Sequence, residues 1–314
     1  MREPRNRLHA FARGLGHTRY VNIPSQLTPH GADRVDLHGR YGRLAALRRR
    51  AGGATEPRPT ARRLPGYTGS KEDFAPLLDP IAAAGFEAIA IDLPGQFESD
   101  GPDDEEAYLP AALGGVIADL VGKLAADGGP VVLLGHSFGG LVARGAVLAG
   151  APVAGLTLMG SGPSELPEGL RRQTLDLGEP AMREFGIEAA YKMREQLDAL
   201  KPPPPGATPD LTAFMRQRFV RSHPAALLGK ARALRAEPDL VSSLARVLHT
   251  AGAPSLVCCG ELDDAWPVSA QRDMADRLDA DFAVIPAARH SPNTENPAAL
   301  LDVLLPTWRS WLDA

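Results

Sequence analysis

The chain has 314 residues, of which 44% are hydrophobic and 23% charged, and its formal net charge is −4. This length suits one large domain with an insertion or two smaller domains, and the composition is that of ordinary globular proteins. The weak negative charge argues against nucleic-acid and membrane partners, and no apolar run approaches the roughly 20 residues of a membrane span. Because the N-terminus lacks the apolar stretch of a secretory signal, we expect a cytoplasmic protein.

The charge is distributed unevenly along the chain. Residues 1–63 hold 14 Lys and Arg against 4 Asp and Glu. We therefore expect a basic N-terminal arm over residues 1–59, with a hairpin at the edge of a sheet over residues 34–47. A basic arm can bind an acidic partner, but a solvated tail is the simpler interpretation.

Strands and helices alternate after this arm. Apolar runs predict strands over residues 86–91, 131–134 and 153–159, and helical patterns lie between them. Such alternation indicates an α/β fold with a mostly parallel sheet covered by helices on both faces. Residues 61–64 stand where a further strand belongs, but Arg62 and Arg63 put two charges into it. We expect this segment to be short and partly exposed, or to pair differently.

The alternation stops between residues 163 and 252, where the pattern predicts helices and no strand. It resumes with strands over 254–259 and 282–285, and a last helix over 297–313. We therefore expect a core of residues 60–162 and 253–314, with residues 163–252 as a helical cap, or lid, inserted after the sixth strand.

A G-x-S-x-G motif, Gly135 to Gly139, joins the apolar strand 131–134 to a helical pattern. A strand, a sharp turn and a helix form the context in which this motif becomes a nucleophile elbow. The turn strains the serine backbone, so glycine is needed where a Cβ would collide with the chain. Ser137 is therefore the candidate nucleophile.

An acid and a histidine follow at the ends of the last two strands. Gly260-Glu-Leu-Asp-Asp-Ala-Trp-Pro267 follows the first of these strands, and His290 follows the second. The carboxyl ends of parallel strands share one edge of the sheet, so serine, acid and histidine should meet there. Asp263 is the candidate acid, and Asp264 is the competing choice.

In these motifs and in their order, residues 60–314 resemble the α/β-hydrolase superfamily, in its lidded, esterase-like branch of serine hydrolases. The resemblance implies that His290 takes the proton of Ser137 and that Asp263 fixes the imidazole. Backbone N–H groups of Phe138 and Tyr67 would form the oxyanion hole. Many relatives have His-Gly at the latter loop, where this chain has Pro65-Gly66.

The residues expected to line the substrate pocket come from the loops at this edge of the sheet. They are Gly66, Tyr67, Phe97, Phe138 and Trp266, although Trp266 could equally pack under the last helix. We expect no organic cofactor and no metal, a small-molecule substrate, and a monomer or a homodimer.

The expected activity is hydrolysis of a carboxylic ester, or of a related acyl bond, in a small and moderately apolar molecule through an acyl-Ser137 intermediate. Serine at position 137 argues against epoxide hydrolases and haloalkane dehalogenases, which use aspartate. Carbon–carbon bond hydrolases, perhydrolases, and biosynthetic acyltransferases or cyclases use the same triad and stay open. A non-catalytic binding protein on this scaffold is the alternative from another class.

Overall fold

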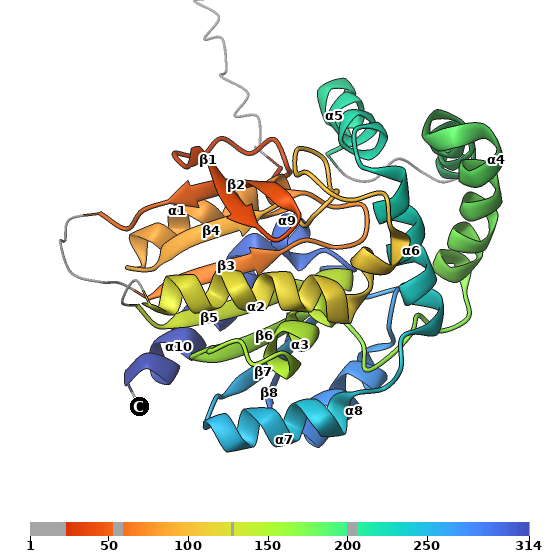
Figure 1. Cartoon of the computed structure of the whole chain (residues 1–314). Helices are drawn as coiled ribbons and strands as arrows, with labels where there is room; N and C mark the ends of the chain where they lie inside the picture. The colour runs from red at the N-terminus through yellow and green to blue at the C-terminus, as the bar shows by residue number, and fades with distance from the viewer. Residues whose placement is uncertain (1–22, 53–58, 127–128, 200–205, 314) are drawn as a thin grey trace, which may run out of the picture.

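The computed structural model describes residues 23–52, 59–126, 129–199 and 206–313, and an eight-stranded sheet forms its centre (Figure 1). The predicted basic arm therefore lies partly outside the described residues. The strands are β1 Asp33–Gly39, β2 Gly42–Arg49, β3 Thr60–Leu64, β4 Glu87–Ile91, β5 Val131–His136, β6 Gly155–Met159, β7 Ser255–Gly260 and β8 Asp281–Ile285. Their spatial order is β1-β2-β4-β3-β5-β6-β7-β8.

The sheet is mostly parallel. β1 and β2 form an antiparallel hairpin at one edge, and β2 pairs antiparallel with β4. The pairings from β4 through β3, β5, β6 and β7 to β8 are all parallel. The predicted α/β-hydrolase fold is confirmed, and its parallel strands bring their carboxyl ends to one edge.

Helices cover both faces of the sheet. One face carries α1 Ala75–Ala83, α9 Pro292–Glu295 and α10 Pro297–Asp313, and the other carries α2 Pro110–Ala126, α3 Phe138–Leu148, α7 Val241–Ala251 and α8 Val268–Leu278. Two short 3₁₀ helices, η1 Lys71–Phe74 and η2 Glu105–Tyr108, follow loops at the carboxyl edge.

Three further helices stand over the carboxyl edge of the sheet (Figure 1): α4 Leu170–Asp198, α5 Pro209–Val220 and α6 Pro224–Ala236. Helix α4 is kinked at Gly186, whose φ is 81°. In contrast, α7 packs against α3 and α8 in the core layer. The helices that overhang the sheet thus end with α6.

Residues 61–64 belong to the short strand β3, but the expectations of partial exposure and of a different pairing were wrong. β3 lies in the middle of the sheet, between β4 and β5, and all five of its residues are buried. Alternate side chains of a strand point to opposite faces, so Arg62 and Arg63 enter different helix layers. The Arg63 guanidinium lies 5.8 Å from the centre of the Phe74 ring. Backbone pairing with two neighbours therefore prevails over the cost of burying two cations.

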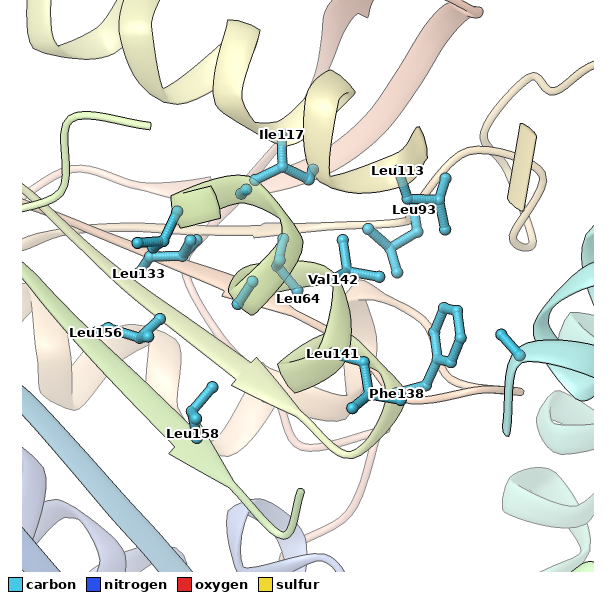
Figure 2. Close-up of a cluster of buried hydrophobic side chains, with 14 of the residues drawn as sticks. Leu64, Leu93, Leu113, Ile117, Leu133, Phe138, Leu141, Val142, Leu156 and Leu158 are labelled. Atoms are coloured by element: carbon cyan, nitrogen blue, oxygen red, sulfur yellow. The ribbon is translucent and has the colours of Figure 1, made fainter. Parts of the chain in front are cut away.

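Buried apolar side chains of α3 and α2 lie together in the cluster that Figure 2 shows. Phe138, Leu141 and Val142 are fully or almost fully buried, and they share one cluster with Leu113 and Ile117 of α2. The two helices approach so closely that a Cβ on Gly114 would lie 2.4 Å from the backbone of α3. The absence of side chains at Gly114 and Gly145 therefore lets α2 and α3 approach closely near the C-terminal end of α3.

Candidate active site

Ser137 occupies the tight turn between β5 and α3. Its φ of 55° and ψ of −121° belong to the sparsely populated region that nucleophile elbows use. A Cβ on Gly135 would lie 2.2 Å from the Gly139 carbonyl oxygen, and one on Gly139 would lie 2.4 Å from the Leu64 carbonyl oxygen. Both positions therefore require glycine, as the sequence predicts.

The structure brings Ser137, His290 and Asp263 into one hydrogen-bonded chain. His290 Nε2 is 2.9 Å from Ser137 Oγ, and His290 Nδ1 is 2.9 Å from Asp263 Oδ1. Asp264 instead pairs with Arg171 at 2.7 Å and is 44% exposed. Burial raises the pKa of Asp263, but the hydrogen bond with His290 and the charge of His290 outweigh burial and lower it below its usual value. Asp263 is therefore ionised at neutral pH.

Asp263 accepts two further hydrogen bonds, from donors that the sequence analysis did not identify. The Ala265 N–H donates to Oδ1 at 2.9 Å, and the Gln271 side chain donates to Oδ2 at 3.0 Å. Gln271 is fully buried and also donates to the Trp266 carbonyl. The signal for Gln271 was its helical spacing with the buried residues of α8, Met274, Ala275 and Leu278, because a glutamine on that face must find polar partners.

His136, the variable residue of the motif, connects the elbow to the histidine loop. Its Nε2 lies 2.8 Å from the carbonyl oxygen of His290, and because a carbonyl only accepts, Nε2 carries the proton. Burial, followed by the charge of His290, lowers the pKa of His136 to about 4. A neutral imidazole thus ties the backbone of His290 to the elbow, a contact that sequence reasoning did not anticipate.

The loop after β3 lies against the serine. A Cβ on Gly66 would be 3.3 Å from the Cβ of Ser137. Buried Gln96 donates to the carbonyl oxygens of Gly66, at 2.7 Å, and Tyr67, at 3.2 Å. In a trans peptide the N–H of Tyr67 points away from the Gly66 carbonyl, so Gln96 sets the direction of that N–H.

Ser137 and His290 open onto a cavity of about 330 Å³ beneath α4, α5 and α6. Of the predicted pocket residues, Tyr67 lines this cavity. Phe97, Phe138 and Trp266 are not among the residues that line it. Phe97 packs against Phe214, Phe138 belongs to the core under α3, and Trp266 donates its indole N–H to the Glu165 carbonyl. Gly66 touches the site through Ser137 without lining the cavity.

The cavity wall is mostly apolar, and its charges are paired. The apolar part of the lining comes mainly from leucine, methionine, alanine and phenylalanine side chains of the overhanging helices, with Leu166 from the segment before α4: Leu166, Leu170, Leu175, Met182, Ala190, Met193, Leu197, Phe219, Leu228, Ala231 and Leu234. Among the charged lining residues, Arg194 lies 3.5 Å from Asp198, and Glu179 pairs with Arg183 and Arg235. Arg171 pairs with Asp264.

Within the described ranges, no three His, Cys, Asp or Glu side chains gather as they would around a metal ion. The helices of the same ranges include none that is long and apolar enough to cross a membrane.

The strand order and a serine on a strand-to-helix turn define the class of α/β-hydrolases. The model of the alpha/beta hydrolase family matches residues 64–303, so the chain belongs to this family. No curated protein matches the chain.

Solved structures with the same fold include esterases and a lactonase. A carboxylesterase structure from the ammonia-oxidizing thaumarchaeon Nitrososphaera gargenis has a TM-score of 0.70 at 16% identity, covering 89% of this chain and 99% of that one. A thermophilic esterase from Thermogutta terrifontis has a TM-score of 0.65 at 23% identity, covering 90% and 98%. The enol-lactonase from Burkholderia xenovorans has a TM-score of 0.67 at 17% identity, covering 89% and 100%. At these identities the likeness is one of fold.

Proposed function

We propose that the protein is a serine hydrolase that cleaves a carboxylic ester, or a related acyl bond, through an acyl-enzyme on Ser137. The observation that carries this proposal is the hydrogen-bonded chain from Ser137 Oγ through His290 to Asp263. His290 accepts the serine proton during attack on the acyl carbon and later passes it to the leaving group. Asp263 keeps the Nδ1–H tautomer and stabilises the imidazolium.

The oxyanion of the tetrahedral intermediate would be met by two main-chain N–H groups. Phe138 N–H stands at the start of α3, where the helix dipole adds positive potential. Tyr67 N–H belongs to the loop that Gln96 orients beside the serine. Losing one such donor typically costs about 3–4 kcal/mol of transition-state stabilisation.

Helices α4, α5 and α6 would act as the cap, a narrower segment than residues 163–252 because α7 packs in the core layer. In this assignment the core supplies the chemistry and the cap supplies most of the cavity wall. The cavity of about 330 Å³ lies near the lower end of the size range of ligand sites, which supports a small substrate.

The mechanism is tested with an active-site-directed fluorophosphonate. We expect the native protein to be labelled and Ser137→Ala to be unlabelled. Asp263→Asn should lower kcat by about 10⁴-fold because the imidazole loses its tautomer, as in other triads. Asp264→Asn is the matched control, since it changes the neighbouring carboxylate, and should keep most activity. Labelling that survives Ser137→Ala, or inactivity of Asp264→Asn alone, would contradict the proposal.

The substrate is expected to be uncharged near its acyl chain. A carboxylate that entered this cavity would lie unpaired against apolar walls or would have to break one of the ion pairs. We expect kcat/KM for p-nitrophenyl hexanoate to exceed that for the p-nitrophenyl monoester of adipic acid by about tenfold or more. Equal values would contradict a neutral substrate. Lactones and thioesters in the same panel would separate the classes of acyl bond.

A further inference from the structure

Four separate parts of the chain meet at Asp73, a carboxylate of η1 that the proposed chemistry does not use. Its oxygens accept hydrogen bonds from the Ser70 N–H at 3.1 Å, the Gln26 side chain at 3.0 Å and the Arg218 guanidinium at 2.5 Å. Its carbonyl accepts from the Asn293 side chain at 2.6 Å. Asp73 and Arg218 are each 6% exposed and Asn293 is 1% exposed. We call these five residues the Asp73 junction.

The junction holds the loop that carries Tyr67. A Cβ on Gly69 would lie 2.3 Å from Asp73 Oδ2 and 3.1 Å from the Gly66 nitrogen. The loop therefore folds directly onto the carboxylate, with no room for a side chain between them. The Gly69 N–H also donates to the Gly66 carbonyl at 3.1 Å, which closes the turn. Moving the carboxylate would thus move the backbone beside Ser137.

The junction also reaches the cap and the histidine loop. Arg218 lies on α5, and its neighbour on that helix, Phe219, lines the cavity. Asn293 lies three residues after His290, at the start of α9. Asp73 therefore contacts the oxyanion loop and a cap helix through its carboxylate, and the segment that follows the catalytic histidine through its main-chain carbonyl.

Charge makes the contact with α5 strong. Burial raises the pKa of Asp73, but the nearby Arg218 outweighs burial and lowers it below its usual value, so the carboxylate is ionised. A buried ion that loses its partner is strongly destabilised. Displacement of α5 would leave Asp73 without its main counter-charge and would favour rearrangement of the loop around it.

We propose that Asp73 is a positioning residue that couples the docking of α5 to the geometry of the oxyanion loop and His290. The hydrolase then reaches its full rate only when the cap is seated over the cavity. This inference rests on the proposed function. The proposed function names the residues of the site, and this inference adds the condition under which those residues take up their catalytic geometry.

Steady-state kinetics of Asp73→Asn, Arg218→Met and the double variant on a p-nitrophenyl ester test the coupling. We expect each single variant to lower kcat by about 10- to 100-fold, because small displacements of catalytic groups have effects of this size. The double variant should lose little more than either single variant, since the two residues act as one unit. Arg218→Lys, which keeps the charge, should recover part of kcat.

The matched control is a second buried ion pair between core and cap. Arg144 of α3 lies 2.5 Å from Glu237, which follows α6, and it is 3% exposed. Arg144→Met should lower the melting temperature as Arg218→Met does, yet leave kcat near that of the native protein. Wild-type kcat in Asp73→Asn and Arg218→Met, or an equal loss of kcat in Arg144→Met, would overturn the proposal.

Hydrogen exchange separates failure of this inference from failure of the proposed function. We expect Arg218→Met to increase exchange at residues 65–70 and 290–296 while β5 and α2 stay protected. Unchanged exchange at those loops would overturn the coupling, whatever the activity. Absence of fluorophosphonate labelling in the native protein would instead overturn the proposed function. The hydrogen-exchange comparison would still test whether α5 is coupled to the two loops.

Discussion

The strained backbone of Ser137 is maintained by its immediate neighbours. Its N–H donates to the Met159 carbonyl at 2.9 Å, and its carbonyl accepts from the Gly140 N–H at 2.8 Å. A positive φ in a residue other than glycine costs on the order of 1–3 kcal/mol, so the surrounding packing must supply that energy. The buried residues of α3 provide such packing, which explains why the serine can stand in one orientation toward His290.

Gln271 offers a test of the support around the acid. In Gln271→Leu the Asp263 Oδ2 atom loses its donor inside a mostly buried site, so the carboxylate becomes less well fixed and its pKa rises. We expect kcat to fall by about tenfold, with a smaller change in KM. Asp276→Asn, on the exposed side of the same helix, is the control for a polar change in α8. Native kcat in Gln271→Leu would show that the acid needs no such support.

At the scale of elements, α6 carries an unusual buried cation. Lys230 is fully buried, and its Nζ has no hydrogen-bond partner among the described residues. Burial lowers the pKa of Lys230 to about 7, although the charge of Asp92 opposes that effect. The unfolded lysine keeps its ordinary pKa of 10.5. Between these values the unfolded chain binds a proton that the folded chain lacks.

The free energy of unfolding should therefore fall as the pH is lowered from about 10 to about 7. Lys230 contributes about 1.4 kcal/mol per pH unit to this fall, and its contribution levels off below the pKa of the folded state. Lys230→Met should raise the free energy of unfolding at pH 7 and remove this contribution, measured by urea unfolding at pH 7 and pH 9. Arg232→Met, an exposed change on the same helix, should keep the native slope. Identical slopes in the native protein and Lys230→Met would contradict a neutral buried lysine.

The strands and loops of the candidate site differ in how well the sequence predicts them. The elbow, the acid loop and His290 could be predicted because each is a short motif at a strand end, and parallel strands bring such ends together. The contact between Asp73 and Arg218 could not be, because 145 residues separate them and neither lies in a motif.

Side-chain direction was harder to predict than strand position. Phe97 and Trp266 were placed in the correct loops, but a loop pattern does not say which way a side chain turns.

The burial of β3 was difficult to predict for a different reason. Two arginines are rare in a central strand, and pairing on both sides nevertheless places this segment between β4 and β5. Tertiary pairing prevailed over local composition.

For the whole molecule, the buried apolar residues of the described ranges form two core clusters and a smaller cluster among the overhanging helices α4, α5 and α6. Residues of α6 such as Ala226 and Leu234 belong to the large cluster with the sheet. Met182, Tyr191 and Phe219 belong to the separate, smaller cluster of the overhanging helices. In α4, four of 29 residues are buried. The overhanging helices are therefore firmly attached to the core through α6 and more weakly packed at α4.

Native-state hydrogen exchange should show this gradient. We expect amides of α4 to exchange through local opening at a lower free energy than those of α6 and β5, because less apolar surface holds α4 in place. Amides of α2, a core helix in contact with α3, serve as the reference for global unfolding. Protection of α4 equal to that of β5 would contradict the expected hierarchy.

The division of the cavity wall has a consequence for how this protein could change its selectivity. Among the described residues, 17 of the 23 that line the cavity lie between Leu166 and Leu234, outside the strand-end loops that hold Ser137, Asp263 and His290. Most of the residues that shape the cavity therefore lie on a different stretch of the chain from Ser137, Asp263 and His290. Substitutions at the cavity-lining positions of α4, a helix that contributes no residue to the Asp73 junction, would change the shape of the cavity while Ser137, Asp263 and His290 keep their places. The proposed hydrolase could therefore acquire a new selectivity without any change to those three residues.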